Sequence, residues 1–104
     1  MNKDMFLKIL QEAADQVFNG KGKERHGHNA PFENQPWRHI VDNVGIGFLL
    51  GQALKKLMEL RTFIPRENTP AAKEQAHSSW RREALGAIVY LVMAIMYKDN
   101  ESKL

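Results

Sequence analysis

The chain has no cysteine and no hydrophobic run long enough to cross a membrane. Without cysteine there is neither a disulfide framework nor a thiolate zinc site, which agrees with a cytoplasmic location. The longest apolar run, from Ala84 to Tyr97, has 14 residues, whereas a spanning helix needs ~20. The first residues, MNKDMFLKIL, lack the apolar stretch and cleavage site of a signal peptide. We therefore expect a cytoplasmic protein that does not enter a membrane.

Internal repeats and low-complexity tracts are also missing, so the 104 residues predict a single domain. The hydrophobic content of 43% and the charged content of 26% are typical of a globular protein. The formal net charge is only +3, but the basic residues form three groups: Lys21, Lys23 and Arg25; Lys55, Lys56 and Arg61; Arg81 and Arg82. Such groups fit either an anionic ligand, such as phosphate, nucleic acid or an acidic protein, or ordinary solubilising surface charge.

The composition and periodicity predict an all-α domain of about four helices around one central helix at 80–97, WRREALGAIVYLVMAIMY. Ala, Leu and Met favour helix, and this segment is apolar on nearly every side. A helix of that kind has to be covered on several faces. Because the chain is short, we expect a second copy to bury part of this surface, which predicts a homodimer.

Three further helices are expected before the central one. The first is amphipathic and covers 2–18, with Asn2 as N-cap and a stop at Asn19-Gly20. The second begins at Pro36. The third runs from about Phe48 to Phe63, and its predicted inward stripe consists of Leu50, Leu54, Leu57 and Leu60 or Arg61.

The glycines of the segment GIGFLLG allow two interpretations. Gly45 and Gly47 divide the segment into two helices, or Gly47 and Gly51 form a flat face for close helix packing. We favour a break or kink near Gly45. The segment is not a dinucleotide fingerprint, because its spacing is G-x-G-x-x-x-G and no strand precedes it.

Two polar connectors and a polar tail complete the domain. The connector at 19–36 is rich in glycine, proline and asparagine, and its Lys21, Lys23, Arg25 and His26 would surround an anion; the alternative is a surface loop without a ligand. The connector at 64–76 contains Thr69-Pro70, which suits an N-cap followed by the first helical residue. The tail at 98–104 is expected to fray.

Both tryptophans precede an arginine at the entrance of a predicted helix. Core anchoring is the favoured role for Trp37 and Trp80. The alternative is a platform that stacks on a nucleobase beside a phosphate-binding cation.

The order of these features resembles the small all-α nucleoside triphosphate pyrophosphohydrolases of the MazG-like group. It is most similar to their short, phage-borne relatives, some of them dATP/dGTP diphosphohydrolase-like. The resemblance covers about residues 19–97, through GKGKERHGHNAPFENQPW, LLGQALKKLMELRTF and SSWRREALGAIVYLVMAI. Its best piece is REALGAIVYLVMAI, which is similar to the last core helix of the family.

The resemblance implies hydrolysis of a nucleoside triphosphate to the monophosphate and pyrophosphate, with Mg²⁺ held by carboxylates of two helices. Glu83 matches the glutamate of the family's last motif, and Glu59 is the acidic residue left in the preceding helix. Ala87 stands where the family has an aspartate, and Lys55 and Lys56 stand where it has glutamates. A two-metal site cannot be built from two carboxylates. Either one Mg²⁺ is held weakly, or the lysines bind phosphate directly and hydrolysis is lost.

We therefore expect a phage-type MazG-like protein that binds a nucleotide or another phosphorylated ligand and hydrolyses it if the metal site suffices. The expected ligand-binding residues are Lys21, Lys23, Arg25, His26, Trp37, Lys55 and Lys56, and the expected Mg²⁺ ligands are Glu59 and Glu83. The alternative is a non-enzymatic helical interaction protein, such as a small phage regulator or inhibitor that binds a host protein or nucleic acid. A nucleotide site predicts that the loop at 20–36 folds over a pocket between 50–60 and 80–86, whereas a binding module predicts an exposed basic loop.

Overall fold

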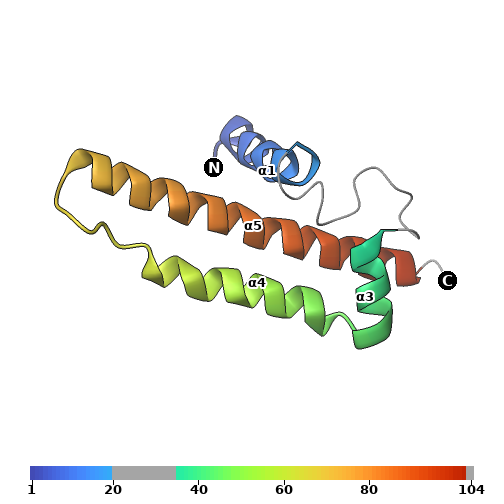
Figure 1. Ribbon diagram of the computed structural model, residues 1–104. Helices are drawn as coiled ribbons and strands as arrows, with labels where there is room; N and C mark the ends of the chain where they lie inside the picture. The colour runs from blue at the N-terminus through green and yellow to red at the C-terminus, as the bar shows by residue number, and fades with distance from the viewer. Residues whose placement is uncertain (20–34, 103–104) are drawn as a thin grey trace.

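The computed structural model describes residues 1–19 and 35–102, and this part of the chain is all-helical (Figure 1). In chain order its elements are α1 (Lys3–Phe18), α3 (Pro36–Val44), α4 (Gly47–Glu59), the short 3₁₀ helix η2 (Leu60–Thr62) and α5 (Pro70–Ser102). No strand occurs within the described ranges. The all-α prediction is therefore confirmed. Among the helices of these ranges, none has the length and apolar character needed to cross a membrane.

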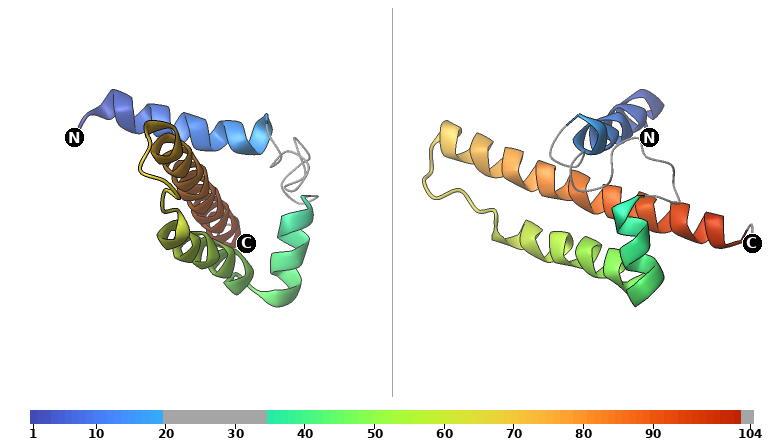
Figure 2. Two further views of the ribbon diagram at one scale, coloured as in Figure 1. Left: turned by 60° about the vertical axis from the view of Figure 1, so that its left-hand side comes forward. Right: turned by 45° about the vertical axis from the view of Figure 1, so that its right-hand side comes forward.

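The long helix α5 is the axis on which the other helices are arranged. It has 33 residues, which corresponds to roughly 50 Å of helix. α4 runs back along it, α1 crosses it, and α3 lies near its C-terminal end (Figures 1 and 2). The most extensive packing joins α4 to α5, followed by α1 to α5. The central apolar segment at 80–97 thus lies within a longer helix that α1 and α4 cover in part.

Local capping sets the starts of α1 and α5, as the sequence predicts. The Asn2 side chain accepts a hydrogen bond from the Met5 backbone N–H at 3.1 Å. The Thr69 hydroxyl accepts one from the Ala72 backbone N–H at 3.1 Å, and Pro70 is the first residue of α5. Each cap satisfies a backbone donor that the first turn of a helix leaves without an internal partner.

The break between α3 and α4 lies at Gly45, which confirms the favoured interpretation of that segment. Gly45 has a φ of +91°, a conformation that residues with a side chain rarely adopt. Its backbone N–H still donates to the Val41 carbonyl at 2.7 Å, which closes the last turn of α3. Pro36 begins α3, also as predicted.

The core lies where α1, α3 and α4 meet the C-terminal half of α5. Leu49 and Val41 are its largest fully buried side chains. The buried cluster consists of Ala13, Trp37, Val41, Leu49, Leu85, Val89, Met93 and Ala94. No polar or charged residue is buried in the part of the chain that the structure describes. Burial of apolar side chains is therefore what holds the four helices together.

The predicted inward stripe of α4 is wrong. Leu50, Leu54 and Leu57 are 48%, 57% and 49% exposed, whereas Leu49 and Ala53 are buried. The helix carries two apolar stripes at helical spacing, and periodicity alone does not distinguish them. The stripe with the small Ala53 is the one that α5 packs against.

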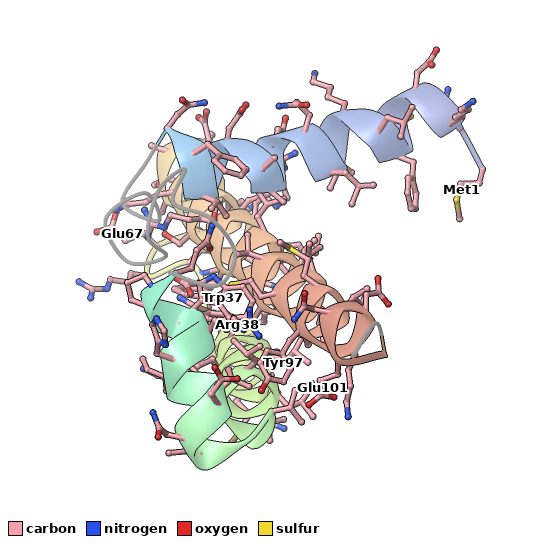
Figure 3. All side chains as sticks on the ribbon, turned by 90° about the vertical axis from the view of Figure 1, so that its right-hand side faces the viewer. Met1, Trp37, Arg38, Glu67, Tyr97 and Glu101 are labelled. Atoms are coloured by element: carbon pink, nitrogen blue, oxygen red, sulfur yellow. The ribbon has the colours of Figure 1, made fainter. Side chains whose placement is uncertain are left out.

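The apolar face of α1 is also covered only in part. Ala13 is buried and Val17 packs on the core, but Met5, Phe6 and Leu10 are exposed. Figure 3 shows the reason: the N-terminal half of α1, next to Met1, projects beyond the other helices. At the other end of the chain, α5 continues as helix to Ser102, where the sequence predicts a frayed tail from residue 98.

Candidate functional site

Lys56 of α4 and Glu83 of α5 form an ion pair between the two helices. The Lys56 Nζ atom donates a hydrogen bond to Glu83 Oε2 at 2.6 Å. Both side chains are largely covered, with 23% and 15% of their surface exposed. Lys56 follows the buried Ala53 by one turn, so the packing face of α4 directs it towards α5.

Gly86 makes room for this ion pair. A Cβ atom at Gly86 would lie 3.3 Å from Lys56 Cε and 3.5 Å from Lys56 Cδ. The lysine side chain therefore crosses α5 over Gly86, where no side chain blocks it, and reaches Glu83 one turn earlier on the same helix. Sequence reasoning missed Gly86. The available signal was a glycine inside an apolar helix, which costs about 1 kcal/mol relative to alanine and usually has a packing reason.

The charge of Glu83 is stabilised by its neighbours. Burial is the largest single effect and raises the pKa of this carboxyl group, but the lowering effects together, led by the hydrogen bond and the positive charge of Lys56, outweigh it. The positive charge of Arg82 lowers the pKa further, and the Glu59 side chain lies close to the same carboxyl group. The net result is a pKa below the ordinary value of a glutamate, so the ion pair is intact at neutral pH.

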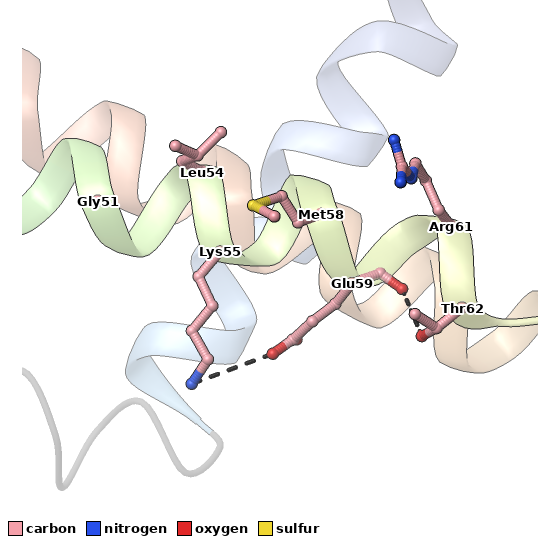
Figure 4. Close-up of a pocket in the computed structure, with 7 residues that line it drawn as sticks. All are labelled: Gly51, Leu54, Lys55, Met58, Glu59, Arg61 and Thr62. Atoms are coloured by element: carbon pink, nitrogen blue, oxygen red, sulfur yellow. Dashed lines mark hydrogen bonds and ion pairs between the residues drawn. The ribbon is translucent and has the colours of Figure 1, made fainter.

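Glu59 links this inner pair to an outer lysine. Its Oε1 atom lies 4.0 Å from Lys55 Nζ, one turn earlier on α4. Figure 4 shows both side chains at the edge of an open groove on α4. The groove is lined by Gly51, Leu54, Lys55, Met58, Glu59, Arg61 and Thr62. Lys55 is 68% exposed and is therefore the lysine of this site that a solute meets first.

Four of the expected site residues thus come together at the α4–α5 junction, namely Lys55, Lys56, Glu59 and Glu83. We call this group the α4–α5 site. The expected phosphate-binding residues Lys21, Lys23, Arg25 and His26 lie outside the described residues, and so does the loop at 20–34.

The base-stacking role for Trp37 does not agree with its position. Trp37 is 3% exposed and belongs to the core cluster. Its indole N–H donates to the Gln35 side chain at 2.6 Å. Because its ring is buried, Trp37 anchors α3 in the core, the role the sequence favours. Trp80 is exposed and stacks on His77, with ring centroids 6.3 Å apart.

The α4–α5 site does not fit a resident Mg²⁺ ion. Mg²⁺ takes oxygen ligands in near-octahedral geometry, and the site offers the carboxylates of Glu59 and Glu83. Lys56 already holds one of these carboxylates at 2.6 Å. Among residues 1–19 and 35–102, no group of three or more His, Asp or Glu side chains is arranged to hold a metal.

Other polar contacts fix how the helices dock. An ion pair between Arg81 and Glu12 joins α5 to α1. The Tyr97 hydroxyl donates to Asp42 at 2.6 Å and ties the end of α5 to α3. This hydrogen bond is the main reason why the pKa of Tyr97 lies above its ordinary value. These contacts are partly or fully solvent-exposed. They hold the helices in position and are not part of the candidate site.

Comparisons of the chain with protein-family models, with curated proteins and with solved structures give no match.

Proposed function

We propose that this chain is a MazG-like helical protein that binds a nucleotide or another phosphorylated ligand at the α4–α5 site, with little or no hydrolysis. The observation that supports this proposal is the convergence of Lys55, Lys56, Glu59 and Glu83 from two helices. These are the helices and positions at which the resemblance places the charged groups of the family.

Lys55 is the residue best suited to meet a phosphate group first. It is exposed, and its ion pair with Glu59, at 4.0 Å, is loose. Exposed pairs of this kind contribute little stability. Lys55 can therefore leave Glu59 for an incoming phosphate group, which is the stronger hydrogen-bond partner. Arg61 lines the same groove and adds a second cation. A phosphate bound there lies against α4 and beside the inner ion pair.

Lys56 is the reason to expect binding without efficient hydrolysis. Its ammonium group supplies positive charge to Glu83, as a metal ion would. An ammonium group, however, has no coordination position for water and does not act as a Lewis acid. Mg²⁺ would have to displace Lys56 from Glu83 before both carboxylates were available. We therefore expect any pyrophosphohydrolysis to be slow.

A thermal-shift screen tests the proposal directly. The purified chain is heated with nucleoside mono-, di- and triphosphates, with and without Mg²⁺. A ligand at about 100 times its Kd adds ~2.7 kcal/mol to the free energy of unfolding. Lys55→Gln should abolish the shift. Lys98→Gln is the matched control, since Lys98 is also exposed and paired with a glutamate on its own helix. Absence of a shift with every phosphate compound, or equal shifts in the two variants, would exclude this site.

A second candidate function is that of a helical interaction protein that binds another macromolecule. The observation that favours it is the number of large apolar side chains that stay exposed on α1, α4 and α5. Large exposed apolar patches mark interaction sites in proteins. The same screen separates the two functions, because an interaction protein has no reason to be stabilised by nucleotides.

A further inference from the structure

A cleft of about 260 Å³ lies between α1 and α5. α1 crosses α5 instead of running along it, so the two helices diverge away from their contact (Figures 1 and 2). Side chains of both helices line the cleft, together with Gln35 and Trp37 at the start of α3. We call this cavity the α1–α5 cleft. Within the described ranges, no residue of the α4–α5 site lines it.

The α1–α5 cleft has no charged side chain among its described lining residues, and of these residues Gln35 alone is polar. Gln35 is the N-cap residue of α3, but its side chain makes no capping hydrogen bond. Its side-chain oxygen instead accepts the indole N–H of the buried Trp37 at 2.6 Å. Such a lining gives an ion no counter-charge and gives water few hydrogen bonds. A neutral, apolar occupant is therefore favoured over both.

Aromatic and sulfur-containing side chains meet in this cleft from three helices. Phe18 belongs to α1, Trp37 to α3, and Met93 and Met96 to α5. An aromatic ring packs favourably on aromatic side chains and on the thioether sulfur of methionine. Methionine is also flexible enough to follow the outline of a flat ring. The lining thus favours an aromatic occupant over a purely aliphatic one.

The volume of the cleft limits the size of this occupant. An apolar cavity of about 150 Å³ is large enough for benzene, whereas the pockets that bind drug-sized molecules measure about 300–1,000 Å³. The α1–α5 cleft, at about 260 Å³, lies between these values. It therefore suits a molecule of roughly two fused rings.

We propose that the α1–α5 cleft binds a small, neutral aromatic molecule. Such a ligand contacts α1 and α5 at once and adds apolar contact to the polar contacts between them. Those contacts are the ion pair of Arg81 with Glu12 and the hydrogen bond from Gln16 to the Arg82 carbonyl at 3.3 Å. A nucleobase is a poor occupant, because its polar edge groups would lose their hydrogen bonds to water in an apolar cleft. This site is therefore distinct from the proposed phosphate-binding site.

Binding of 1-naphthylamine to the full chain tests the proposal. This fused-ring amine is uncharged at neutral pH, and its fluorescence shifts to shorter wavelength in apolar surroundings. The chain has two tryptophans, so in Trp80→Phe energy transfer from Trp37 reports a probe bound beside it. We expect saturable binding of one probe per chain, with transfer from Trp37. The charged analogue 5-aminonaphthalene-1-sulfonate should bind at least ~10-fold more weakly, because the cleft offers its sulfonate no partner.

A substitution that fills the cleft provides the second test. Ala14 lines the cleft on α1, and Ala14→Leu should weaken binding of 1-naphthylamine at least ~10-fold, because added methyl groups occupy the space of the ligand. Ala71→Leu makes the same change at an exposed position in the first turn of α5 and should bind like the wild type. Far-ultraviolet circular dichroism shows whether both variants keep their helices. If Ala14→Leu does not, energy transfer from Trp37 and the comparison of the two probes still decide the question.

Several outcomes would overturn the proposal. They are the absence of saturable binding, equal affinities for the neutral and the charged probe, absence of energy transfer in Trp80→Phe, and equal binding by the two folded leucine variants. ATP should not displace 1-naphthylamine, and Lys55→Gln should leave its binding unchanged, because Lys55 lies on α4 and does not line the cleft. Displacement by ATP would mean that the cleft belongs to a nucleotide site instead. The two proposals can therefore fail separately.

Discussion

The side chain of Lys56 passes directly over Gly86, with its Cε atom 3.3 Å from the position of a Cβ atom there. The missing side chain on α5 is thus matched to a long side chain on α4. This match explains how the ammonium group of Lys56 reaches Glu83 although α4 and α5 share the most extensive helix contact of the described chain. It also makes Gly86 part of the candidate site, although glycine offers no chemistry of its own.

Replacement of Gly86 by valine should break this arrangement. The branched side chain would occupy the path of Lys56 and separate it from Glu83, and overpacking of this kind costs about 1–3 kcal/mol. Urea denaturation measures the free energy of unfolding. Gly51→Ala is the control, because nothing lies within 4 Å of its Cβ position, and it should stabilise the protein by roughly 0.5–1 kcal/mol. Equal effects of the two variants would contradict the close contact.

The ion pair of Glu83 should appear in the pH dependence of stability. The pKa of Glu83 in the folded chain lies below its ordinary value of 4.5. Its contribution is therefore fully present above about pH 4.5 and is lost as the pH falls through the lower folded pKa. The free energy of unfolding of the wild type and of Glu83→Gln should be measured between pH 7 and pH 3. The difference between them should shrink towards acid pH, and a constant difference would mean that Glu83 is not ion-paired.

Helix starts were predictable from the sequence because they depend on local chemistry. Asn2, Pro36 and Pro70 act within one turn of the chain. Gly45 supplies the positive φ that the break between α3 and α4 requires at one residue. The side of a helix that packs inwards depends on the rest of the molecule. That is why the choice between the two apolar stripes of α4 was wrong.

The candidate site was predictable only in part, for the same reason. The resemblance singles out Glu59 and Glu83, and the structure brings Glu83 within the influence of Glu59 and Lys56. The direct bond between Lys56 and Glu83 depends on the register of two helices, which no local pattern specifies. Trp37 illustrates the converse, since the sequence favours a core anchor for this residue but leaves a stacking platform open, and the burial of its ring decides between the two roles.

The bond between Tyr97 and Asp42 should be visible in a tyrosine titration. The chain has two tyrosines, and the hydrogen bond to Asp42 raises the pKa of Tyr97 above 10.0. Absorbance near 295 nm follows ionisation of the phenol groups. Asp42→Asn should shift part of the titration to lower pH, whereas Asp15→Asn, which lies on α1, should leave it unchanged. An unchanged curve in Asp42→Asn would show that the two side chains do not pair in solution.

The orientation of α4 can be tested with two adjacent leucines. Leu49 is fully buried and Leu50 is 48% exposed, so the two residues share chemistry and helix position but differ in environment. Leu49→Ala should lower the free energy of unfolding by about 2–5 kcal/mol, because it removes buried methyl groups and leaves a cavity. Leu50→Ala should cost well under about 1 kcal/mol in the monomer. Chemical denaturation of both variants at low protein concentration measures the difference. The reverse ranking would mean that α4 is rotated and that the stripe of Leu50, Leu54 and Leu57 faces the core after all.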